Sequence, residues 1–395
     1  MNYILFDDYT RNNLLPFTFT KPVADIRFGI LTIREKWERF LNCKTSSLTE
    51  NYLSIKFPLR KEEKNTLING SFCPNNILVD EIINLKTNQA LVFEDSIIAL
   101  HLPAADIDIL FDESADNLEN IESKSNPLRL QNLWDIFSKN GEALNEDFIQ
   151  ITKNRKSAKI SNTNKLINAN DIFAEEDAII EYATLNATAG PIYIGKNAEI
   201  MEGSAIRGSF ALCENATVKM NAKIYGPTTI GPYSKVGGEI NNSVIFGYSN
   251  KAHDGFLGNS VIGEWCNLGA DTNNSNLKNN YDEVKLWNYP TKKFIKTGMQ
   301  FCGLFMGDHS KCGINTMFNT GTVVGANANI FGDGFQRNFI PSFSWGGTSG
   351  FVDYDIDKAI EVAERVYQRR NLEFTDTDKN ILKYIFLLTK GFRKH

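Results

Sequence analysis

The stretch Ile194–Glu199 (IGKNAE) opens a run of hexads that each begin with an aliphatic residue. The first residues of these hexads are Ile194, Ile200, Ile206, Leu212, Val218, Ile224, Ile230 and Val236. A period of six fits neither the 3.6-residue turn of an α-helix nor the two-residue alternation of a half-buried strand. It is typical of a parallel β-helix, in which short strands joined by repeated corners stack aliphatic side chains about 4.8 Å apart.

The six-residue repeat resumes further along the chain. Its later members are Ile262, Leu268, Met306, Cys312, Phe318, Val324 and Ile330. The segment Asp271–Cys302, rich in Asn and Lys, interrupts the repeat and is predicted to leave the coil as a loop. Long excursions from a rigid solenoid commonly cover a binding site. The alternative is a spacer coil that carries a loop without function.

Composition excludes several classes of protein. The 395 residues carry a net charge of −5 and no basic block, which argues against a nucleic-acid partner. No N-terminal signal or long apolar run is present, so we expect a cytoplasmic protein without a membrane partner. The six cysteines lack CxxC spacing and are expected to be free thiols, and the four histidines form no pair at metal-ligand spacing.

The residues on either side of the repeat have a different character. Apolar stretches alternate with helical patterns before residue 155, which predicts an α/β layer domain. The predicted strands are Tyr3–Phe6, Ala90–Phe93 and Ser96–Leu100, and the predicted helices are Gly29–Leu41, Leu128–Lys139, Asp355–Arg370 and Thr375–Thr389. The acidic stretch Asp112–Asn126 is expected to be an exposed loop. We therefore predict an α/β domain at 1–155, a β-helix at 156–345 and a C-terminal helical segment at 346–395.

A resemblance to a known family rests on two motifs inside the coil. His253–Gly258 (HDGFLG) followed by Val261–Ala270 (VIGEWCNLGA) resembles an H-x-x-[YF]-[LIV]-G…IG-x-x-x-N-x-GA signature without a gap, and Gly303–Asn315 is a second matching run. This signature belongs to the GlmU-like bifunctional sugar-1-phosphate nucleotidylyltransferases/acetyltransferases. The resemblance covers about residues 185–335. It implies a left-handed β-helix and a homotrimer with active sites between subunits.

The resemblance also implies roles for single residues in acetyl transfer from acetyl-CoA. A neutral imidazole suits the proton abstraction that this reaction needs, so His253 is the candidate general base. The backbone N–H of Ala270 would stabilise the oxyanion of the tetrahedral intermediate. The remaining expected contacts are Asn267, Asn276 and Phe256 for the substrate, and Thr322 and Gly325 for coenzyme A. The alternative for His253 is a corner histidine with structural hydrogen bonds.

Two departures from the family pattern concern the acceptor. Phe256 stands where the family has a sugar-binding Tyr, and the position expected to be basic falls near Asn241. A phosphate-pairing cation is therefore missing from its usual place. We expect an amino sugar phosphate or a nucleotide sugar as the partner, without choosing between them.

The N-terminal domain departs further. The family begins with a strand followed by L-A-x-G-x-G-T-R, whose glycines let backbone N–H groups surround nucleotide phosphates. Here Thr10-Arg11 and Lys21-Pro22 persist, but Asp7 and Asp8 replace the glycines. The two carboxylates could hold Mg²⁺ or could repel a triphosphate. Arg11 and Lys21 are the candidate nucleotide contacts.

Three functions therefore remain open. The first is a GlmU-like enzyme that transfers an acyl group from coenzyme A to nitrogen or oxygen of a sugar, with His253 as base. The second is nucleotidyl transfer from UTP or dTTP to a sugar 1-phosphate, with the β-helix serving in assembly. The third is a non-catalytic scaffold that binds sugar nucleotides on an inherited fold.

Overall fold

The computed structural model describes residues 2–111 and 118–393. Contacts divide the chain into two compact units, of which the first comprises Met1–Leu14, Thr20–Ile26 and Leu31–Gln131. The second comprises Leu15–Phe19, Arg27–Ile30 and Asn132–His395. Among the described residues, no helix has the length and apolar character needed to cross a membrane.

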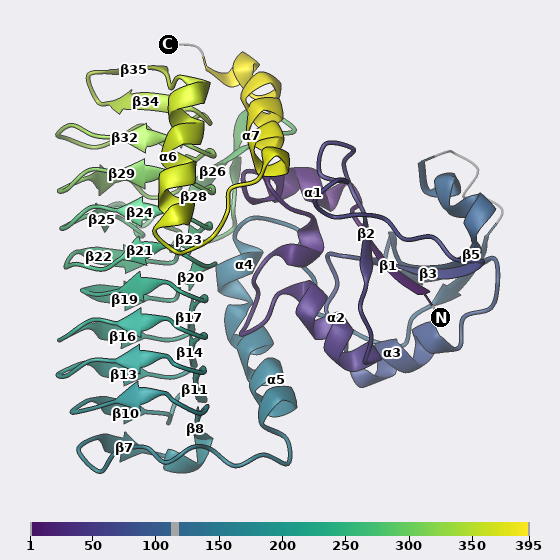
Figure 1. Ribbon diagram of the computed structural model, residues 1–395, viewed down its shortest axis with the longest axis horizontal. Coiled ribbons are helices and arrows are strands. Elements are labelled where there is room, and N and C mark those ends of the chain that lie inside the picture. Colours follow the sequence, from purple (N-terminus) through teal and green to yellow (C-terminus); the bar gives the residue numbers. More distant parts are fainter. Residues whose placement is uncertain (1, 112–117, 394–395) are drawn as a thin grey trace. The chain divides into compact units, whose positions relative to one another are not determined.

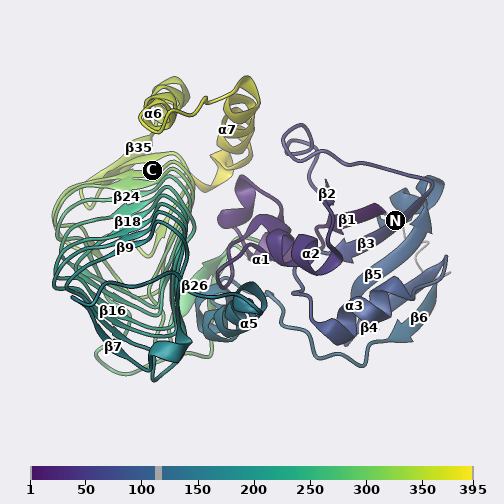
Figure 2. The same cartoon turned by 60° about the horizontal axis from the view of Figure 1, so that its bottom comes forward.

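The first unit is built on one mixed sheet, with strands in the order β2-β1-β3-β5-β4-β6. The strands are β1 (Asn2–Phe6), β2 (Ser46–Leu48), β3 (Lys64–Asn69), β4 (Gln89–Phe93), β5 (Ser96–Pro103) and β6 (Glu119–Glu122). β1 runs parallel to β2 and β3, whereas β5 runs antiparallel to β3 and β4. The same unit contains the short helix α1 (Thr10–Asn13) and the helices α2 (Ile33–Leu41) and α3 (Asn76–Ile83) (Figure 2). The predicted α/β layer domain and its three predicted strands are confirmed.

Two predicted helices have different bounds in the structure. The helix predicted to begin at Gly29 begins at Ile33, because Thr32 caps it by accepting a hydrogen bond from the Glu35 N–H. The helix predicted over Leu128–Lys139 shrinks to α4 (Asp135–Ser138), and α5 (Asn140–Thr152), which was not predicted, follows it. α5 belongs to the second unit, where Asn140 donates to the Thr229 hydroxyl at 3.1 Å.

The acidic stretch Asp112–Asn126, which was predicted to be an exposed loop, also contains a strand. Its residues Glu119–Glu122 form β6, which pairs in parallel with β4. Residues 112–117 lie outside the described part of the chain.

The second unit is the predicted parallel β-helix, whose rungs are stacked in Figure 1. One face is a six-stranded sheet of β7 (Lys165–Ile167), β10 (Thr184–Asn186), β13 (Ala205–Arg207), β16 (Lys223–Tyr225), β19 (Glu239–Asn241) and β22 (Phe256–Gly258). The second face has nine strands, which are β8 (Ile172–Ala174), β11 (Ile192–Ile194), β14 (Phe210–Leu212), β17 (Thr228–Ile230), β20 (Val244–Ile245), β23 (Val261–Ile262), β28 (Leu304–Met306), β31 (Thr322–Val324) and β33 (Phe339–Ile340). The third has ten strands, which are β9 (Ile179–Ile180), β12 (Glu199–Ile200), β15 (Thr217–Val218), β18 (Lys235–Val236), β21 (Asn250–Lys251), β24 (Asn267–Leu268), β29 (Lys311–Cys312), β32 (Asn329–Ile330), β34 (Ser344–Gly347) and β35 (Gly350–Asp353). The left-handed β-helix predicted from the repeat and its resemblance is thus confirmed.

The side chains that define the repeat form the core of this coil. All eight residues from Ile194 to Val236 that begin a hexad are at most 1% exposed and belong to one apolar cluster. Each pairs with its counterpart in the next coil, as Val218 does with Val236. Burial of this continuous aliphatic column stabilises the fold by about 25 cal/mol for each Å² removed from water.

The predicted loop Asp271–Cys302 is more ordered than expected. The coil continues past Asp271 into β25 (Asn273–Asn274), which pairs with β30 (Met317–Phe318). The excursion itself contains the antiparallel hairpin of β26 (Lys285–Asn288) and β27 (Lys293–Lys296). Val284 and Leu286 anchor this hairpin because both are buried.

The two predicted C-terminal helices are confirmed as α6 (Ile356–Gln368) and α7 (Asp376–Leu388). Asp355 and Thr375 cap their N-termini. The Tyr367 ring of α6 stacks on Trp265 at 3.9 Å between centroids, and Trp265 stacks in turn on Tyr248 at 4.2 Å. α6 therefore packs on the coil at Trp265, between β23 and β24, while β35 covers the edge of β34 by antiparallel pairing.

Candidate functional site

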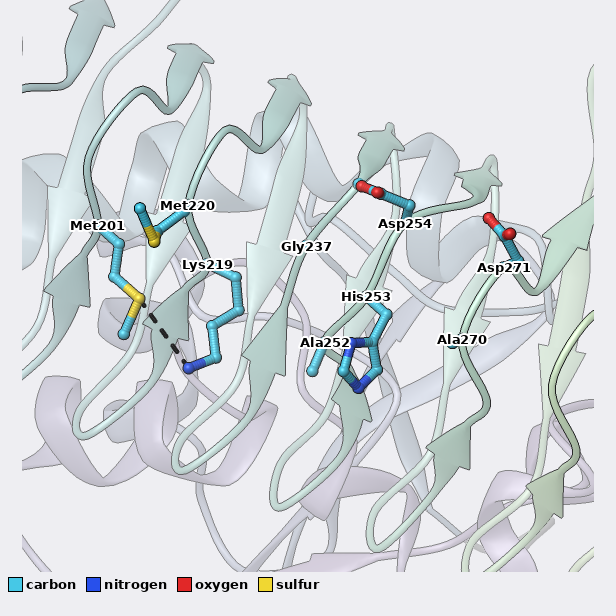
Figure 3. A pocket seen from close by; sticks show the side chains of 10 residues that line it. Met201, Lys219, Met220, Gly237, Ala252, His253, Asp254, Ala270 and Asp271 are labelled. Atoms are coloured by element: carbon cyan, nitrogen blue, oxygen red, sulfur yellow. Dashed lines mark hydrogen bonds between the residues drawn. The ribbon is translucent and has the colours of Figure 1, made fainter.

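A surface pocket of about 510 Å³ surrounds His253 on the β-helix. It is lined by Met201, Lys219, Met220, Gly237, Gly238, Ala252, His253, Asp254, Ala270 and Asp271. These residues come from five successive coils, and Figure 3 shows the exposed His253 side chain between the coil of Gly237 and that of Ala270. The pocket thus offers an imidazole, a lysine and two carboxylates to a ligand on one ridge of the coil.

The corner that carries His253 is fixed by close backbone packing. Gly238 and Gly255 both have positive φ values, +74° and +108°, which L side chains rarely adopt. A Cβ on Gly255 would lie 2.3 Å from the Thr272 carbonyl oxygen of the coil above. The Asp271 N–H donates to the Asp254 carbonyl oxygen at 3.1 Å. The corner is therefore held between its two neighbours with little room for movement.

Ala270 lies in the same pocket as His253, as the resemblance implied. Its carbonyl oxygen accepts a hydrogen bond from the Asn315 N–H at 2.8 Å. In the described part of the chain, its own N–H donates no hydrogen bond. A backbone donor is thus available at this position for a bound ligand.

The expected substrate contacts Asn267, Phe256 and Asn276 lie outside the lining of this pocket. Asn267 is exposed on β24, where its side-chain oxygen lies 3.5 Å from Nδ2 of Asn250. Phe256 and Asn276 come together over Gly258, since a Cβ built there would lie 2.5 Å from the ring and 2.7 Å from the amide. The structure therefore separates these three residues into two groups, both apart from the pocket lining.

Thr322 and Gly325 lie within the packed coil. Thr322 is fully buried on β31, and its hydroxyl donates to the Asn319 carbonyl oxygen at 2.9 Å. A Cβ on Gly325 would lie 2.3 Å from the Ser342 nitrogen. Both residues thus have packing roles here, and contact with coenzyme A at this level stays a prediction.

The first unit has its own pocket, of about 320 Å³, where β1 and β3 end. It is lined by Phe6, Asp7, Asp8, Tyr9, Leu48, Asn69, Asp95, Ser96 and Ile97. The carboxyl ends of parallel strands are where α/β sheets commonly bind ligands. The predicted residues Asp7 and Asp8 therefore lie at the place that a nucleotide site of this domain would occupy.

Both carboxylates are engaged with protein groups. Asp7 accepts hydrogen bonds from Arg11 at 2.9 Å, from the Val23 N–H at 2.8 Å and from the Thr49 hydroxyl at 2.5 Å. Burial raises the pKa of Asp7, while Arg11 and these hydrogen bonds act in the opposite direction.

Asp8 has an equivalent set of partners. It accepts hydrogen bonds from the Thr10 N–H and from Asn69, both at 2.8 Å, and from Arg129 at 3.3 Å. In the described ranges, no three His, Cys, Asp or Glu side chains gather as a metal site. Asp7 and Asp8 are thus paired with arginines in this structure, and Mg²⁺ binding by the two carboxylates stays a prediction.

Arg11 and Lys21, the predicted phosphate contacts, are both buried, with 5% and 4% of their surface exposed. Arg11 also donates to the Lys21 carbonyl oxygen at 3.1 Å and to the Tyr52 hydroxyl at 3.1 Å. Neither residue lines the pocket. In this conformation both side chains lie in the interior of the domain and not at the pocket.

Two residues important to these sites were not predicted. Arg129 joins Asp8, Thr10 and Ser96 from a distant part of the sequence, which no local motif could indicate. Lys251 lies fully buried beneath the His253 corner. A lysine at an inward position of the repeat would have indicated this role. The coil is shortened to fifteen residues at this level, however, so counting in sixes does not place Lys251 at an inward position.

Comparison with known proteins identifies the class of the N-terminal domain. Residues 3–156 match the family model of the sugar nucleotidyl transferases. The first unit is thus a nucleotidyltransferase-like domain, in agreement with the resemblance of its first residues.

The curated relatives are named as bifunctional proteins. The chain is 33% identical over 144 residues to the bifunctional sugar-1-phosphate nucleotidylyltransferase/acetyltransferase of Sulfurisphaera tokodaii, covering 36% of this chain and 35% of that protein. It is 31% identical over 127 residues to the bifunctional protein GlmU of Methanocaldococcus jannaschii, covering 32% and 26%. The chain thus spans about a third of the length of these relatives. By sequence similarity the chain resembles the GlmU-like proteins over this part of their length, and the first of these relatives is named as a transferase.

Among solved structures, the UDP-N-acetylglucosamine acyltransferase of Francisella novicida is 13% identical, with a TM-score of 0.32 over 59% of this chain and 91% of that one. A hexapeptide transferase family protein from Anaplasma phagocytophilum is 14% identical, with a TM-score of 0.27 over 56% and 92%. Likenesses at this level support no conclusion about activity.

Proposed function

We propose that this protein transfers an acyl group, acetyl in the simplest case, from coenzyme A to an amino sugar phosphate or a nucleotide sugar. The observation that carries the proposal is the shared pocket of His253 and Ala270. It supports a site in which a base and an oxyanion donor face the same ligand. The bifunctional acetyltransferase names of the curated relatives support the same chemistry.

In the proposed step, the imidazole of His253 takes a proton from the amine or hydroxyl of the acceptor as that group attacks the thioester carbonyl. The N–H of Ala270 donates to the oxyanion of the tetrahedral intermediate. The intermediate collapses with cleavage of the carbon–sulfur bond, and the thiolate of coenzyme A leaves and takes the proton from the imidazolium. The products are the acylated sugar and free coenzyme A, and no covalent enzyme intermediate is needed.

Several finer assignments belong to this proposal. Lys219 lines the pocket two coils before His253 and supplies a cation for an acidic acceptor, in place of the basic residue missing near Asn241. Asn267, Phe256 and Asn276 would contact the acceptor, and Thr322 and Gly325 would lie on the coenzyme A side. A homotrimer would bring a second subunit to this ridge of the coil, which would complete contacts that one chain leaves open.

Nucleotidyl transfer to a sugar 1-phosphate is the second candidate, because the family model matches residues 3–156. The buried Arg11 and the pairing of Asp7 and Asp8 with arginines argue against it in this conformation. Release of pyrophosphate from UTP or dTTP in the presence of a sugar 1-phosphate would establish this activity.

The test is an assay of coenzyme A release from acetyl-CoA with amino-sugar 1-phosphates and with UDP- and dTDP-amino sugars. We expect turnover with one class of acceptor, and a loss of at least about 100-fold in kcat for His253→Ala, since general base catalysis contributes 10²–10⁴-fold. His101→Gln, which changes a histidine of the other unit, is the matched control. Release that is unchanged in His253→Ala would contradict the mechanism, and no release from any acceptor would favour the scaffold.

A further inference from the structure

The inward column of the β-helix carries one lysine beside the candidate site. Val218 pairs with Val236 eighteen residues on, but Val236 pairs with Lys251 after only fifteen residues. The coil is shortened at this point, and Lys251 takes the inward position where the neighbouring coils have Val236 and Leu268. Its side chain is 1% exposed. A cation has thus replaced an aliphatic side chain at the one level of the coil where His253 stands.

The ammonium group of Lys251 is bound by main-chain carbonyls of the site. Its Nζ donates to the carbonyl oxygens of His253 at 2.6 Å and of Asp254 at 2.8 Å, and lies 3.4 Å from that of Gly237. Two of these carbonyls belong to the corner that carries the imidazole, and the third belongs to the coil below. Lys251 therefore ties the His253 corner to its neighbour from inside the coil.

Burial of the Lys251 ammonium costs free energy, which suggests that this lysine has a role other than stabilising the fold. A buried ammonium loses hydration, and hydrophobic replacement of buried charges is often neutral or stabilising. Burial lowers the pKa of Lys251 to about 8, against the opposing influence of Asp254, Asp271 and Cys312. At pH 7 the group keeps its proton, so all three donors are available to the three carbonyls.

A lysine with similar contacts elsewhere in the coil provides a comparison. Nζ of Lys311 donates to the carbonyl oxygen of His309 at 2.9 Å, again two residues away along the chain. His309 lies in an aromatic cluster and does not line the pocket. Lys311 is thus a matched control for the general effect of a lysine that binds a corner carbonyl.

We infer that Lys251 is a positioning residue, which holds the main chain of the His253 corner in the geometry that proton abstraction requires. This inference rests on the proposed acyl transfer. Reacting groups must be placed within a fraction of an ångström, and a displacement of about 1 Å can cost 10²-fold in rate. Lys251 does not line the pocket, so the effect of replacing it is expected in kcat rather than in substrate binding.

The test uses Lys251→Met, which keeps the length and apolar stem of the side chain, beside Lys311→Met. We expect kcat for coenzyme A release to fall at least about tenfold in Lys251→Met, with KM for acetyl-CoA within about twofold and the melting temperature unchanged or raised. We also expect the imidazole NMR signals of His253 to shift in this variant. Lys311→Met should change neither kcat nor those signals.

A kcat within about twofold of the parent enzyme in folded Lys251→Met would overturn the inference. If Lys251→Met does not fold, Lys251→Gln takes its place, since an amide can still donate to one or two of the carbonyls. A partial loss of kcat is then expected. Full activity of Lys251→Gln would again overturn the inference. If the parent protein releases no coenzyme A at all, the proposed function fails, but the His253 signals and hydrogen exchange at Asp271, whose N–H donates to the Asp254 carbonyl oxygen, still decide the positioning role. Faster exchange in Lys251→Met would support it, and unchanged exchange with unchanged signals would refute it.

Discussion

At the scale of single residues, Arg129 connects several polar side chains of the N-terminal domain. It donates to Asp8, Thr10 and Ser96, and its guanidinium lies 4.5 Å from the centroid of the Phe72 ring. The side chains of Arg129 and Asp8 are only 6% and 15% exposed. Such a pair adds little net stability as a whole, but removal of one partner leaves a buried charge without compensation.

We therefore expect Arg129→Met to lower the free energy of unfolding of this domain by about 3–5 kcal/mol. Urea denaturation followed by circular dichroism measures the change. Lys86→Met, at an exposed position of the same domain, should stay within about 0.5 kcal/mol of the parent protein. A loss below about 1 kcal/mol in Arg129→Met would mean that Asp8 finds other partners.

His101 makes the stability of the same domain depend on pH. Its Nδ1 lies 3.0 Å from the Thr66 hydroxyl in the sheet, and burial, together with Lys64, lowers the pKa of this imidazole below its ordinary value of 6.5. The unfolded chain then binds more protons than the folded one below pH 6.5, so stability is lost as the pH falls through that range.

Replacement of this histidine should remove that part of the pH dependence. We expect the difference in unfolding free energy between pH 7.5 and pH 5.5 to be smaller in His101→Gln than in the parent protein. Urea titrations at both pH values provide the measurement. An identical difference in the two proteins would show that other groups carry the acid sensitivity.

Single residues also show which parts of the candidate sites could be predicted from the sequence and which could not. His253 and Ala270 were predicted because they lie in one uninterrupted motif, and both line the pocket. Lys251 could not be recognised as inward-facing, because a coil shortened to fifteen residues breaks the six-residue count. Arg129 reaches Asp8 across 121 positions of sequence, and only the fold brings them together.

At the scale of elements, the coil depends on how closely its corners approach one another. Gly231 and Gly313 both follow an inward residue of the repeat, but their surroundings differ. A Cβ on Gly231 would lie 1.4 Å from the Phe246 carbonyl oxygen, whereas the nearest atom to a Cβ on Gly313 would be 3.6 Å away.

We therefore expect Gly231→Ala to destabilise the β-helix by at least about 2–3 kcal/mol, because the backbone of two coils must move apart. Gly313→Ala should be within about 0.5 kcal/mol of the parent protein. Thermal unfolding monitored by tryptophan fluorescence compares the two variants. Equal melting temperatures would mean that the corner at Gly231 relaxes without cost.

The stack of Tyr248, Trp265 and Tyr367 fixes α6 to the coil. Loss of the Tyr367 ring should release the helix, since aromatic pairs contribute about 0.5–1.5 kcal/mol beyond the area they bury. We expect Tyr367→Ala to increase hydrogen exchange throughout α6, and Tyr367→Phe, which keeps the ring, to leave it unchanged. Exchange that is equally slow in Tyr367→Ala would assign the docking of α6 to other contacts.

Element boundaries show a further limit of prediction from sequence. The C-terminal helices were predicted almost to the residue from apolar residues at helical spacing, and Asp355 and Thr375 cap them in the structure. Gly29 was wrongly included in a helix, because its close contact with Ala143 and Asp147 of α5 is a tertiary feature. Likewise, β25 escaped prediction because two Asn residues give no strand signal.

At the scale of the whole molecule, the second unit includes two short segments from the N-terminal part of the chain. From these segments, Phe17 packs against Phe246 with ring centroids 5.0 Å apart, and Phe19 lies edge-on to Tyr289 at 5.4 Å. Phe17 and Phe19 are 0% and 2% exposed. The β-helix unit is therefore completed by residues that precede most of the N-terminal domain.

A fragment of residues 132–395 should consequently be less stable than the same unit in the full chain. We expect a loss of at least about 3 kcal/mol, in the range found for truncation of a buried Phe, and Phe17→Ala in the full chain should reproduce a large part of it. Urea denaturation followed by tryptophan fluorescence compares the three proteins. A fragment as stable as the unit in the full chain would refute this dependence.

The excursion between β25 and β28 has a consequence for how such a protein can change. Asn274 pairs with Phe318 and Leu268 with Cys312, so the chain leaves the coil and re-enters it in register. The pairing of the rungs therefore does not depend on the excursion itself, whose attachment to the coil rests on buried residues such as Val284 and Leu286. We expect that the rest of the excursion can change in sequence and length while the stacked rungs that carry His253 and Ala270 remain as they are.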